Sequence, residues 1–116
     1  MRGEGMNSEA LKGYNDLMIL FLLLEKDSYG YELSRRIREL TGQQYVMKET
    51  TLYSVFDRLE RTGYIESYYG TETFGKRRTY YRLTPEGRAY YFKRCAEWKE
   101  TVAIVGCFIA DDMKEE

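Results

Sequence analysis

The segment from Lys48 to Leu83 constrains the fold of this chain most strongly, because its periodicity changes from helical to extended within a few residues. Its first part has apolar residues at the i, i+3, i+4 and i+7 positions that form one helix face, namely Leu52, Val55, Phe56 and Leu59. We expect this helix to begin near Glu49 or Thr50 and to end at Gly63, since glycine is the usual residue just beyond a helix.

The second part of the segment indicates a β-hairpin. Residues 64–69 and 78–83 are rich in aromatic and β-branched side chains, as is typical of strands. The loop between them contains Gly70 and Gly75. Three consecutive basic residues close this loop, and they are Lys76, Arg77 and Arg78. The sequence therefore predicts a hairpin with a cationic tip.

A helix followed by a basic hairpin is the order of parts in a winged helix. In that fold a recognition helix enters the major groove of DNA and the wing reaches the neighbouring backbone or minor groove. The residues left outward in the first turns of the predicted helix are mostly short and polar: Thr50, Thr51, Tyr53, Ser54, Asp57 and Arg58. Short polar groups suit close approach to base edges, so the pattern favours a nucleic-acid partner.

Two further helices are expected before this segment. Residues 8–25 carry apolar side chains that become denser toward Leu24, and 29–40 show an apolar stripe at Leu33, Ile37 and Leu40. We expect residues 1–7 to be disordered because they are small and charged. The predicted fold class is mainly α with a small β-hairpin, and residues 8–84 form the winged helix-turn-helix domain.

A long C-terminal helix is predicted from Pro85 to about Met113, with Thr84 as its N-cap and 114–116 as an acidic tail. Apolar residues recur in it with the spacing of a coiled-coil seam, at Tyr91, Cys95, Trp98, Val102, Val105 and Ile109. A helix of about 29 residues is about 43 Å long, which exceeds the width of a small domain. The apolar part of this helix that extends beyond its own domain is most simply buried by a second copy of the chain, and packing on its own domain is the alternative.

Composition excludes several classes of protein. The chain of 116 residues is long enough for one domain, and its longest apolar run, Leu17 to Leu24, is too short to span a bilayer. No signal peptide is visible, so we expect a cytoplasmic protein without a membrane partner. The absence of histidine, of a C-x-x-C pair and of a glycine-rich phosphate loop predicts no metal, no cofactor and no enzymatic activity. Cys95 and Cys107 are expected to be reduced thiols, with a redox role as the alternative.

The charge of the chain is segregated. The net charge is −1, which taken alone disfavours nucleic acid, but residues 76–82 hold four basic residues and no acid, while 111–116 hold four acids and one lysine. One surface can therefore meet phosphate while the rest keeps the protein soluble. The acidic balance leaves an alternative open, which is a winged-helix module that binds protein and not DNA.

Three motifs, in this order, resemble those of the PadR family of transcriptional regulators. Residues 29–33 (YGYEL) resemble its G-Y-E-L segment, 51–53 (TLY) and 58–65 (RLERTGYI) resemble its T-L-Y and R-L-E-x-x-G-x-I signature, and 77–87 (RRTYYRLTPEG) resemble its wing. The likeness extends from about Ser8 to Trp98. The single short C-terminal helix is similar to that of the small LmrR-like subfamily.

This resemblance implies a homodimeric repressor that binds double-stranded DNA at inverted-repeat operators. It implies that Tyr53 contacts a phosphate, that Thr50, Thr51 and Ser54 lie in the groove, and that the wing acts through Lys76, Arg77 and Arg78. The alternatives are a packing role for Tyr53 and solvated hairpin charge for the two arginines. Asp57 departs from relatives that carry a basic residue there, so no phosphate contact is expected at that position.

The resemblance also implies a ligand site at Trp98. In LmrR-like proteins a tryptophan at the matching position lies at the dimer centre, where two copies can stack a planar aromatic ligand. The alternative is a tryptophan that only fills the dimer seam. Those proteins carry an acid one turn later that favours cationic compounds, whereas this chain has Val102, so no preference for cations is implied.

Overall fold

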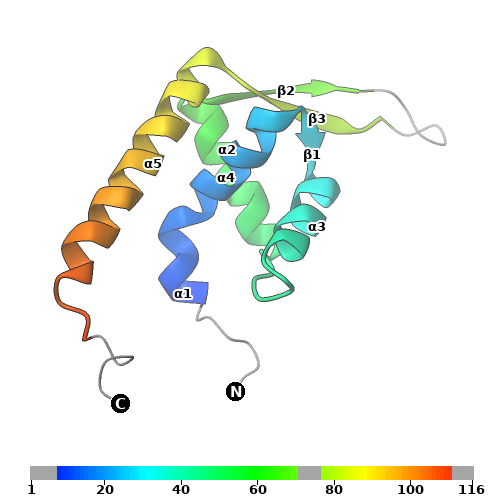
Figure 1. The fold of residues 1–116 in the computed structure, drawn as a ribbon. Coiled ribbons are helices and arrows are strands. Elements are labelled where there is room, and N and C mark those ends of the chain that lie inside the picture. The colour runs from blue at the N-terminus through cyan, green and yellow to red at the C-terminus, as the bar shows by residue number, and fades with distance from the viewer. Residues whose placement is uncertain (1–7, 71–76, 111–116) are drawn as a thin grey trace.

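The computed structural model describes residues 8–70 and 77–110. The regions predicted as a disordered N-terminus (1–7) and an acidic tail (114–116) lie outside the described residues, as does Lys76. In chain order the elements are α1 (Ser8–Leu11), the 3₁₀ turn η1 (Lys12–Tyr14), α2 (Asn15–Glu25), β1 (Ser28–Tyr29), α3 (Gly30–Leu40), α4 (Glu49–Arg61), β2 (Ile65–Tyr69), β3 (Thr79–Leu83) and α5 (Pro85–Gly106). Figure 1 shows α2, α3 and α4 packed beneath the sheet, with α5 along one side.

The sheet has three antiparallel strands in the order β1-β3-β2, one more than the predicted hairpin. The added strand β1 pairs Ser28 with Tyr81 and Tyr29 with Tyr80. The sequence prediction was wrong here, because it began the second helix at Tyr29, whereas α3 begins at Gly30. A strand of two residues is too short to show alternation in the sequence, and only its pairing with β3 defines it.

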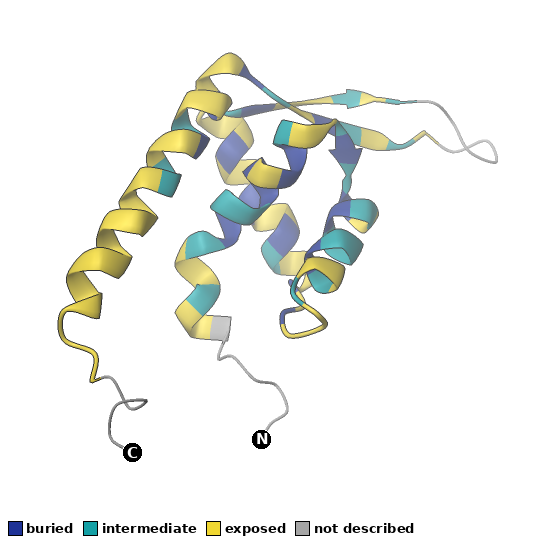
Figure 2. Cartoon of the chain, viewed as in Figure 1, coloured by how far each residue is buried: buried dark blue, intermediate teal, exposed yellow. Residues whose placement is uncertain are grey.

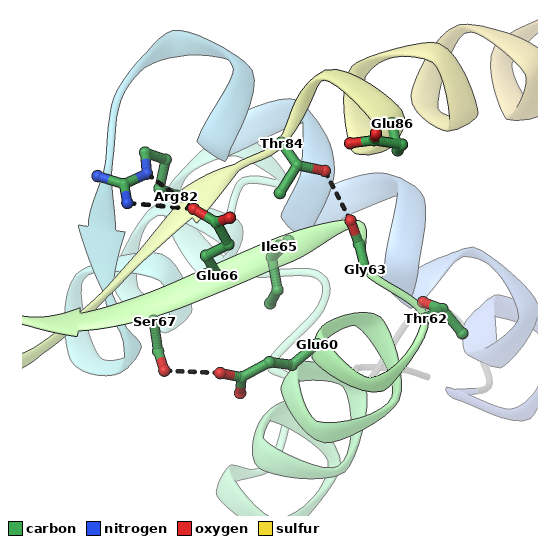
Figure 3. Close-up of a pocket in the computed structure, with 9 residues that line it drawn as sticks. All are labelled: Glu60, Thr62, Gly63, Ile65, Glu66, Ser67, Arg82, Thr84 and Glu86. Carbon is green, nitrogen blue, oxygen red and sulfur yellow. Dashed lines mark hydrogen bonds and ion pairs between the residues drawn. The ribbon is translucent and has the colours of Figure 1, made fainter.

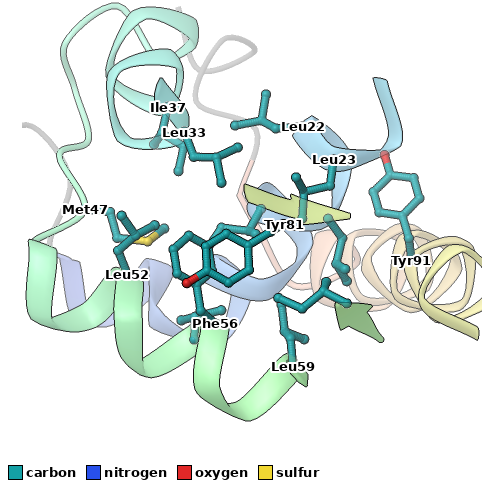
Figure 4. Packing of buried hydrophobic residues seen from close by; sticks show 14 of the residues in the cluster. Leu22, Leu23, Leu33, Ile37, Met47, Leu52, Phe56, Leu59, Tyr81 and Tyr91 are labelled. Atoms are coloured by element: carbon teal, nitrogen blue, oxygen red, sulfur yellow. The ribbon is translucent and has the colours of Figure 1, made fainter. Parts of the chain in front are cut away.

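The core lies where α2, α3 and α4 meet the sheet (Figure 4). The predicted inner face of α4 is confirmed, since all four of its apolar residues are buried: Leu52, Val55, Phe56 and Leu59. The ring of Phe56 stacks on Tyr81 of β3 at 4.0 Å between centroids. Burial of each such side chain stabilises the fold by about 1.5–3 kcal/mol, so this face fixes α4 against the sheet and leaves its opposite face outward.

The first predicted helix is not continuous. The 3₁₀ turn η1 interrupts it and contains Gly13, which is a poor helix former. The next two residues, Asn15 and Asp16, are polar yet buried. The Tyr45 hydroxyl donates to Asn15 Oδ1 at 2.6 Å, and the Tyr90 hydroxyl donates to Asp16 Oδ2 at 3.0 Å. These hydrogen bonds satisfy the two buried side chains and fix the start of α2.

Helix α5 begins as predicted but ends earlier. The Thr84 hydroxyl accepts a hydrogen bond from Gly87 N at 2.9 Å, which confirms the N-cap, and Pro85 is the first helical residue. The prediction that this helix continues to about Met113 was wrong, because it ends at Gly106. Cys107 N then donates to Ile104 O at 3.1 Å in a tight turn, so Ile109 lies beyond the helix. A glycine lowers helix propensity by about 1 kcal/mol, which favours an end at this point.

Burial divides α5 into two halves (Figure 2). Tyr91 is buried in the core of its own chain and Cys95 is half-buried against it, so these two predicted seam residues pack within the chain, and their place in a seam between copies stays a prediction. The four later seam residues are exposed: Trp98 (46%), Val102 (48%), Val105 (50%) and Ile109 (66%). Across the described part of the chain, no helix is both long and apolar enough to cross a membrane.

Candidate nucleic-acid interface

Helix α4 presents the polar surface that the sequence predicted. Thr50, Tyr53 and Ser54 are exposed and Thr51 is half-buried, whereas the inner face of the same helix is fully packed. Helix α3 precedes α4 through the connector 41–48, so the two helices form a helix-turn-helix unit. The four predicted α4 residues therefore lie on the accessible side of the helix, where their hydroxyl groups can approach a partner.

The side chain of Tyr53 is held at the start of α3. Its ring meets Phe56 edge-on at 5.3 Å, and it is 47% exposed. A Cβ atom placed on Gly30 would lie 2.6 Å from the Tyr53 hydroxyl oxygen, so only a glycine leaves room for this hydroxyl. The two roles considered for Tyr53, packing and a phosphate contact, are therefore compatible, since its ring packs on Phe56 while the residue remains about half exposed.

The wing arginines rest on tyrosines. The guanidinium of Arg78 lies 4.1 Å from the Tyr29 ring centroid, and that of Arg77 lies 4.4 Å from the Tyr69 centroid. Tyr29 also packs edge-on against Tyr80 at 5.4 Å. Cation–π contacts contribute about 0.5–1 kcal/mol at exposed sites and restrict the arginine side chains before any partner binds. Tyr29 and Tyr69 therefore hold the two wing arginines in place before a partner binds.

A depression of about 310 Å³ joins the wing to α4, and its lining includes Tyr29, Tyr31, Tyr53, Arg78 and Thr79. It brings together two predicted residues, Tyr53 and Arg78. A phenol and a guanidinium both donate hydrogen bonds to phosphate oxygens, so the pair suits a nucleic-acid backbone. Tyr29 and Tyr31 were not named as site residues from the sequence, although they belong to the 29–33 motif that carried the resemblance.

Two carboxylates near this surface are engaged by partners within the chain. Asp57, on the exposed face of α4, pairs with Arg61 at 3.4 Å, which reduces the repulsion expected between this acid and phosphate. At the start of α3 the Ser28 hydroxyl donates to Glu32, and this hydrogen bond lowers the pKa of the Glu32 carboxyl. Burial raises the pKa of Tyr81, so the phenol beneath the depression stays neutral.

A larger depression of about 690 Å³ has the opposite electrostatic character (Figure 3). It lies between the end of α4, the outer strand β2 and the start of α5, and three acids line it: Glu60, Glu66 and Glu86. Arg82 is its only lining cation, and it pairs with Glu66 at 3.1 Å. The surplus of carboxylates disfavours phosphate here. Within residues 8–70 and 77–110, no group of three or more acids and cysteines is placed to hold a metal ion.

The fold and this surface together define a winged helix-turn-helix protein, with α3 and α4 as the helical pair and β2–β3 as the wing. Residues 19–93 match the family model described as the transcriptional regulator PadR-like family. The chain belongs to this family. The membership confirms the resemblance to the PadR family and the prediction of a transcription regulator as opposed to an enzyme.

Individual proteins agree with this membership. A transcriptional regulator from Clostridium thermocellum is 55% identical, with a TM-score of 0.84 over 90% of this chain and 99% of that one. An uncharacterized protein of Lysinibacillus sphaericus is 44% identical over 104 residues, which are 90% of this chain and 95% of that protein. Bacillus subtilis PadR in complex with operator DNA is 22% identical, with a TM-score of 0.62 over 69% of this chain and 45% of that one, and shares the fold.

Proposed function

We propose that this regulator is a homodimeric repressor that binds an inverted-repeat operator in double-stranded DNA. The observation that carries the proposal is the shared depression of Tyr53 and Arg78 beside the polar face of α4. Family membership supports it, and so does the operator-bound state of the Bacillus subtilis relative, which has the same fold. In this proposal α4 enters the major groove and the wing follows the backbone.

We assign each predicted residue a role in this proposal; for Lys76, which lies outside the described residues, the assignment rests on the sequence alone. Thr50, Thr51 and Ser54 face base edges, because short hydroxyl side chains permit a close approach of the helix. Tyr53 donates its hydroxyl to a phosphate. Arg77 and Arg78 contact the backbone beside the wing, together with Lys76. Phosphate contacts of this kind set the register of the protein on the duplex, and the groove residues supply sequence preference.

The second half of α5 supports the dimer. Trp98, Val102 and Val105 expose apolar area along about two helical turns, and each remains about half exposed in the described part of the chain. A second copy would bury this stripe by the same surface on both subunits, as in most closed dimers. Two recognition helices related by a two-fold axis would then read two half-sites, which is why an inverted repeat is the proposed operator.

The proposal includes a ligand that releases the repressor. The indole of Trp98 meets Tyr14 edge-on at 5.0 Å and is about half exposed, so it offers area for a planar aromatic compound between two copies. Val102 lies one turn later, and an apolar neighbour gives no preference for cations. Quenching of this single tryptophan by planar aromatics that do not bind DNA, together with weaker operator binding, would support the ligand. Unchanged operator affinity at saturation would exclude a regulatory role.

Fluorescence anisotropy on a labelled duplex from the upstream region of the gene tests DNA binding, with a scrambled duplex for comparison. We expect tight, salt-dependent binding that prefers the upstream duplex. The double variant Arg77→Ala, Arg78→Ala should flatten the slope of log K against log salt by about 1.8 for each subunit bound, or about 3.6 for the dimer, since each phosphate contact contributes about 0.9. Arg82→Ala is the control, because Arg82 pairs with Glu66 and lines the acidic depression.

Two results would contradict the proposal. An unchanged slope in the double arginine variant would remove the wing from the interface. Weak binding that is equal on both duplexes would instead favour the alternative function, a winged-helix module that binds a protein partner, for which the acidic composition is the supporting observation.

A further inference from the structure

A third depression, of about 230 Å³, lies on the other flank of α4, between this helix and the turn η1. Its polar lining consists of Lys12, Asn15, Thr50, Thr51, Ser54 and Arg58. We propose that it is a second phosphate-binding site, in which Lys12 and Arg58 contact the DNA strand opposite to the one held by Tyr53 and Arg78. This inference rests on the proposed DNA-binding function and adds Lys12 and Arg58 to the residues proposed to contact DNA.

The geometry of α4 places the two sites on opposite sides. Residues three and four positions apart share a helix flank, so Ser54 and Arg58 lie together, whereas Tyr53 lies on the other flank. The depressions agree, since Ser54 and Arg58 line the one at η1 and Tyr53 lines the one at the wing. The exposed ridge of α4 lies between the two.

The dimensions of DNA allow a helix in the major groove to contact a phosphate backbone on each of its two flanks. A helix with its side chains is about 10–12 Å across, and the major groove is about 12 Å wide. A helix that fills the groove therefore has one phosphate backbone along each flank. On the wing side Arg78 and Tyr53 meet one backbone. The second backbone faces the side of η1, where Lys12 and Arg58 are the cations.

The charges of Lys12 and Arg58 are uncompensated. Both side chains are exposed, and neither forms an ion pair with any residue in the described ranges. Two acids that lie near them in sequence are already engaged by other cations, because Asp57 pairs with Arg61 and Asp16 with Arg94. The two cations are therefore available to a phosphate, and they supply local positive charge on a chain whose net charge is −1.

The turn that carries Lys12 is anchored on both sides. Arg94 of α5 donates a hydrogen bond to the carbonyl oxygen of Gly13, and the Tyr45 hydroxyl donates to Asn15 Oδ1. The backbone on which Lys12 stands is consequently fixed relative to α4. A lysine on a fixed turn loses less entropy on binding than one on a free terminus, which favours a specific contact over a diffuse one.

The salt dependence of DNA binding tests this site, by anisotropy with the labelled upstream duplex and a scrambled duplex of equal length. Lys12→Ala and Arg58→Ala should each flatten the slope of log K against log salt by about 0.9 for each subunit bound on both duplexes, and the double variant by about 1.8 for each subunit bound. Lys12→Arg and Arg58→Lys should restore the slope. The controls are Lys93→Ala and Arg88→Ala, which remove exposed charges of the same kind on α5, outside the depression.

The outcomes distinguish failure of the second phosphate site from failure of the proposed DNA-binding function. If the unchanged protein binds neither duplex with salt dependence, both are overturned. If the Arg77, Arg78 double variant flattens the slope but the Lys12 and Arg58 variants do not, the repressor function stands and the second phosphate site is wrong. Thermal melting of each variant at equal concentration should match that of the unchanged protein, since both side chains are exposed.

Discussion

The close approach between the first turn of α5 and the carbonyl of Tyr64 gives a sharp stability prediction for Gly87→Ala. A Cβ atom on Gly87 would lie 2.0 Å from Tyr64 O and 2.9 Å from Leu83 Cδ1. Ordinary contact begins near 3.4 Å, so helix and carbonyl must separate by roughly 1.4 Å. The obstructing atom belongs to the backbone, so no side-chain rotation relieves the clash.

The cost follows from what this separation breaks. Thr84 N donates to Tyr64 O at 3.1 Å, and the Thr84 hydroxyl joins Gly63 O at 2.7 Å to Gly87 N at 2.9 Å. Loss of the cap costs about 1 kcal/mol, and strain from overpacking adds about 1–3 kcal/mol. Together they destabilise the protein by about 2–4 kcal/mol, a large fraction of the usual 5–15 kcal/mol.

Thermal unfolding by circular dichroism measures this effect. For a chain of this length about 1 kcal/mol corresponds to about 4 °C, so Gly87→Ala should lower Tm by about 8–16 °C. All samples need equal protein concentration, because dimerisation would make Tm concentration-dependent. Gly13→Ala is the matched control, since its Cβ meets nothing within 4 Å and should leave Tm equal or slightly higher. A Gly87→Ala variant that melts within about 2 °C of the unchanged protein would refute the argument.

Three further predictions test other parts of the molecule. Gly30→Ala should displace the Tyr53 hydroxyl and weaken operator binding about fivefold to tenfold, which corresponds to the loss of about one hydrogen bond. Anisotropy would measure the weaker binding, and thermal melting should show little change in Tm. Glu32→Gln should destabilise the protein by about 1–2 kcal/mol at neutral pH. The hydrogen bond from Ser28 is the main reason that the pKa of the folded Glu32 carboxyl lies below its usual 4.5, so the ionised carboxylate stabilises the fold fully above pH 4.5. In urea titrations the difference in unfolding free energy between Glu32→Gln and the unchanged protein should therefore vanish as the pH falls through the lowered pKa. Val105→Glu should dissociate the proposed dimer in sedimentation velocity, and an unchanged sedimentation coefficient would place the interface elsewhere.

The elements that could be predicted from the sequence are those with a repeating local pattern. Helix α4 carries its apolar spacing over its whole length, and the wing strands carry aromatic runs, so both were found within about a residue. The end of α5 was missed because the apolar spacing continues to Ile109, past the point where Gly106 and the tight turn end the helix. Periodicity reports which face would be buried, and it does not report where a helix stops.

The candidate site was predictable in part for the same reason. Thr50 and Tyr53 lie on a helix whose inner face is obvious, so their outward direction follows from the sequence. Tyr29 and Lys12 lie in segments far from α4 along the chain, and only the folded structure brings them beside Arg78 and Arg58. A contact between distant segments leaves no local pattern in a single sequence, so the sequence predicted the α4 residues on both flanks and missed Tyr29 and Lys12, which complete them.

The first turn of α2 holds α4, the proposed recognition helix, and α5, the proposed dimerisation helix, in a fixed relative orientation. Asn15 accepts a hydrogen bond from Tyr45, in the connector that leads into α4, while Asp16 accepts one from Tyr90 and pairs with Arg94, both on α5. Adjacent residues thus attach α2 to the recognition helix through its connector and to the helix of the proposed dimer. In such a dimer the spacing of the recognition helices depends on the angle between α5 and α4, and an inverted repeat fixes the spacing that is tolerated. Buried hydrogen-bonded pairs are costly to break, at about 1–3 kcal/mol for each group left unsatisfied, so each subunit should present its recognition helix to DNA as part of one rigid unit.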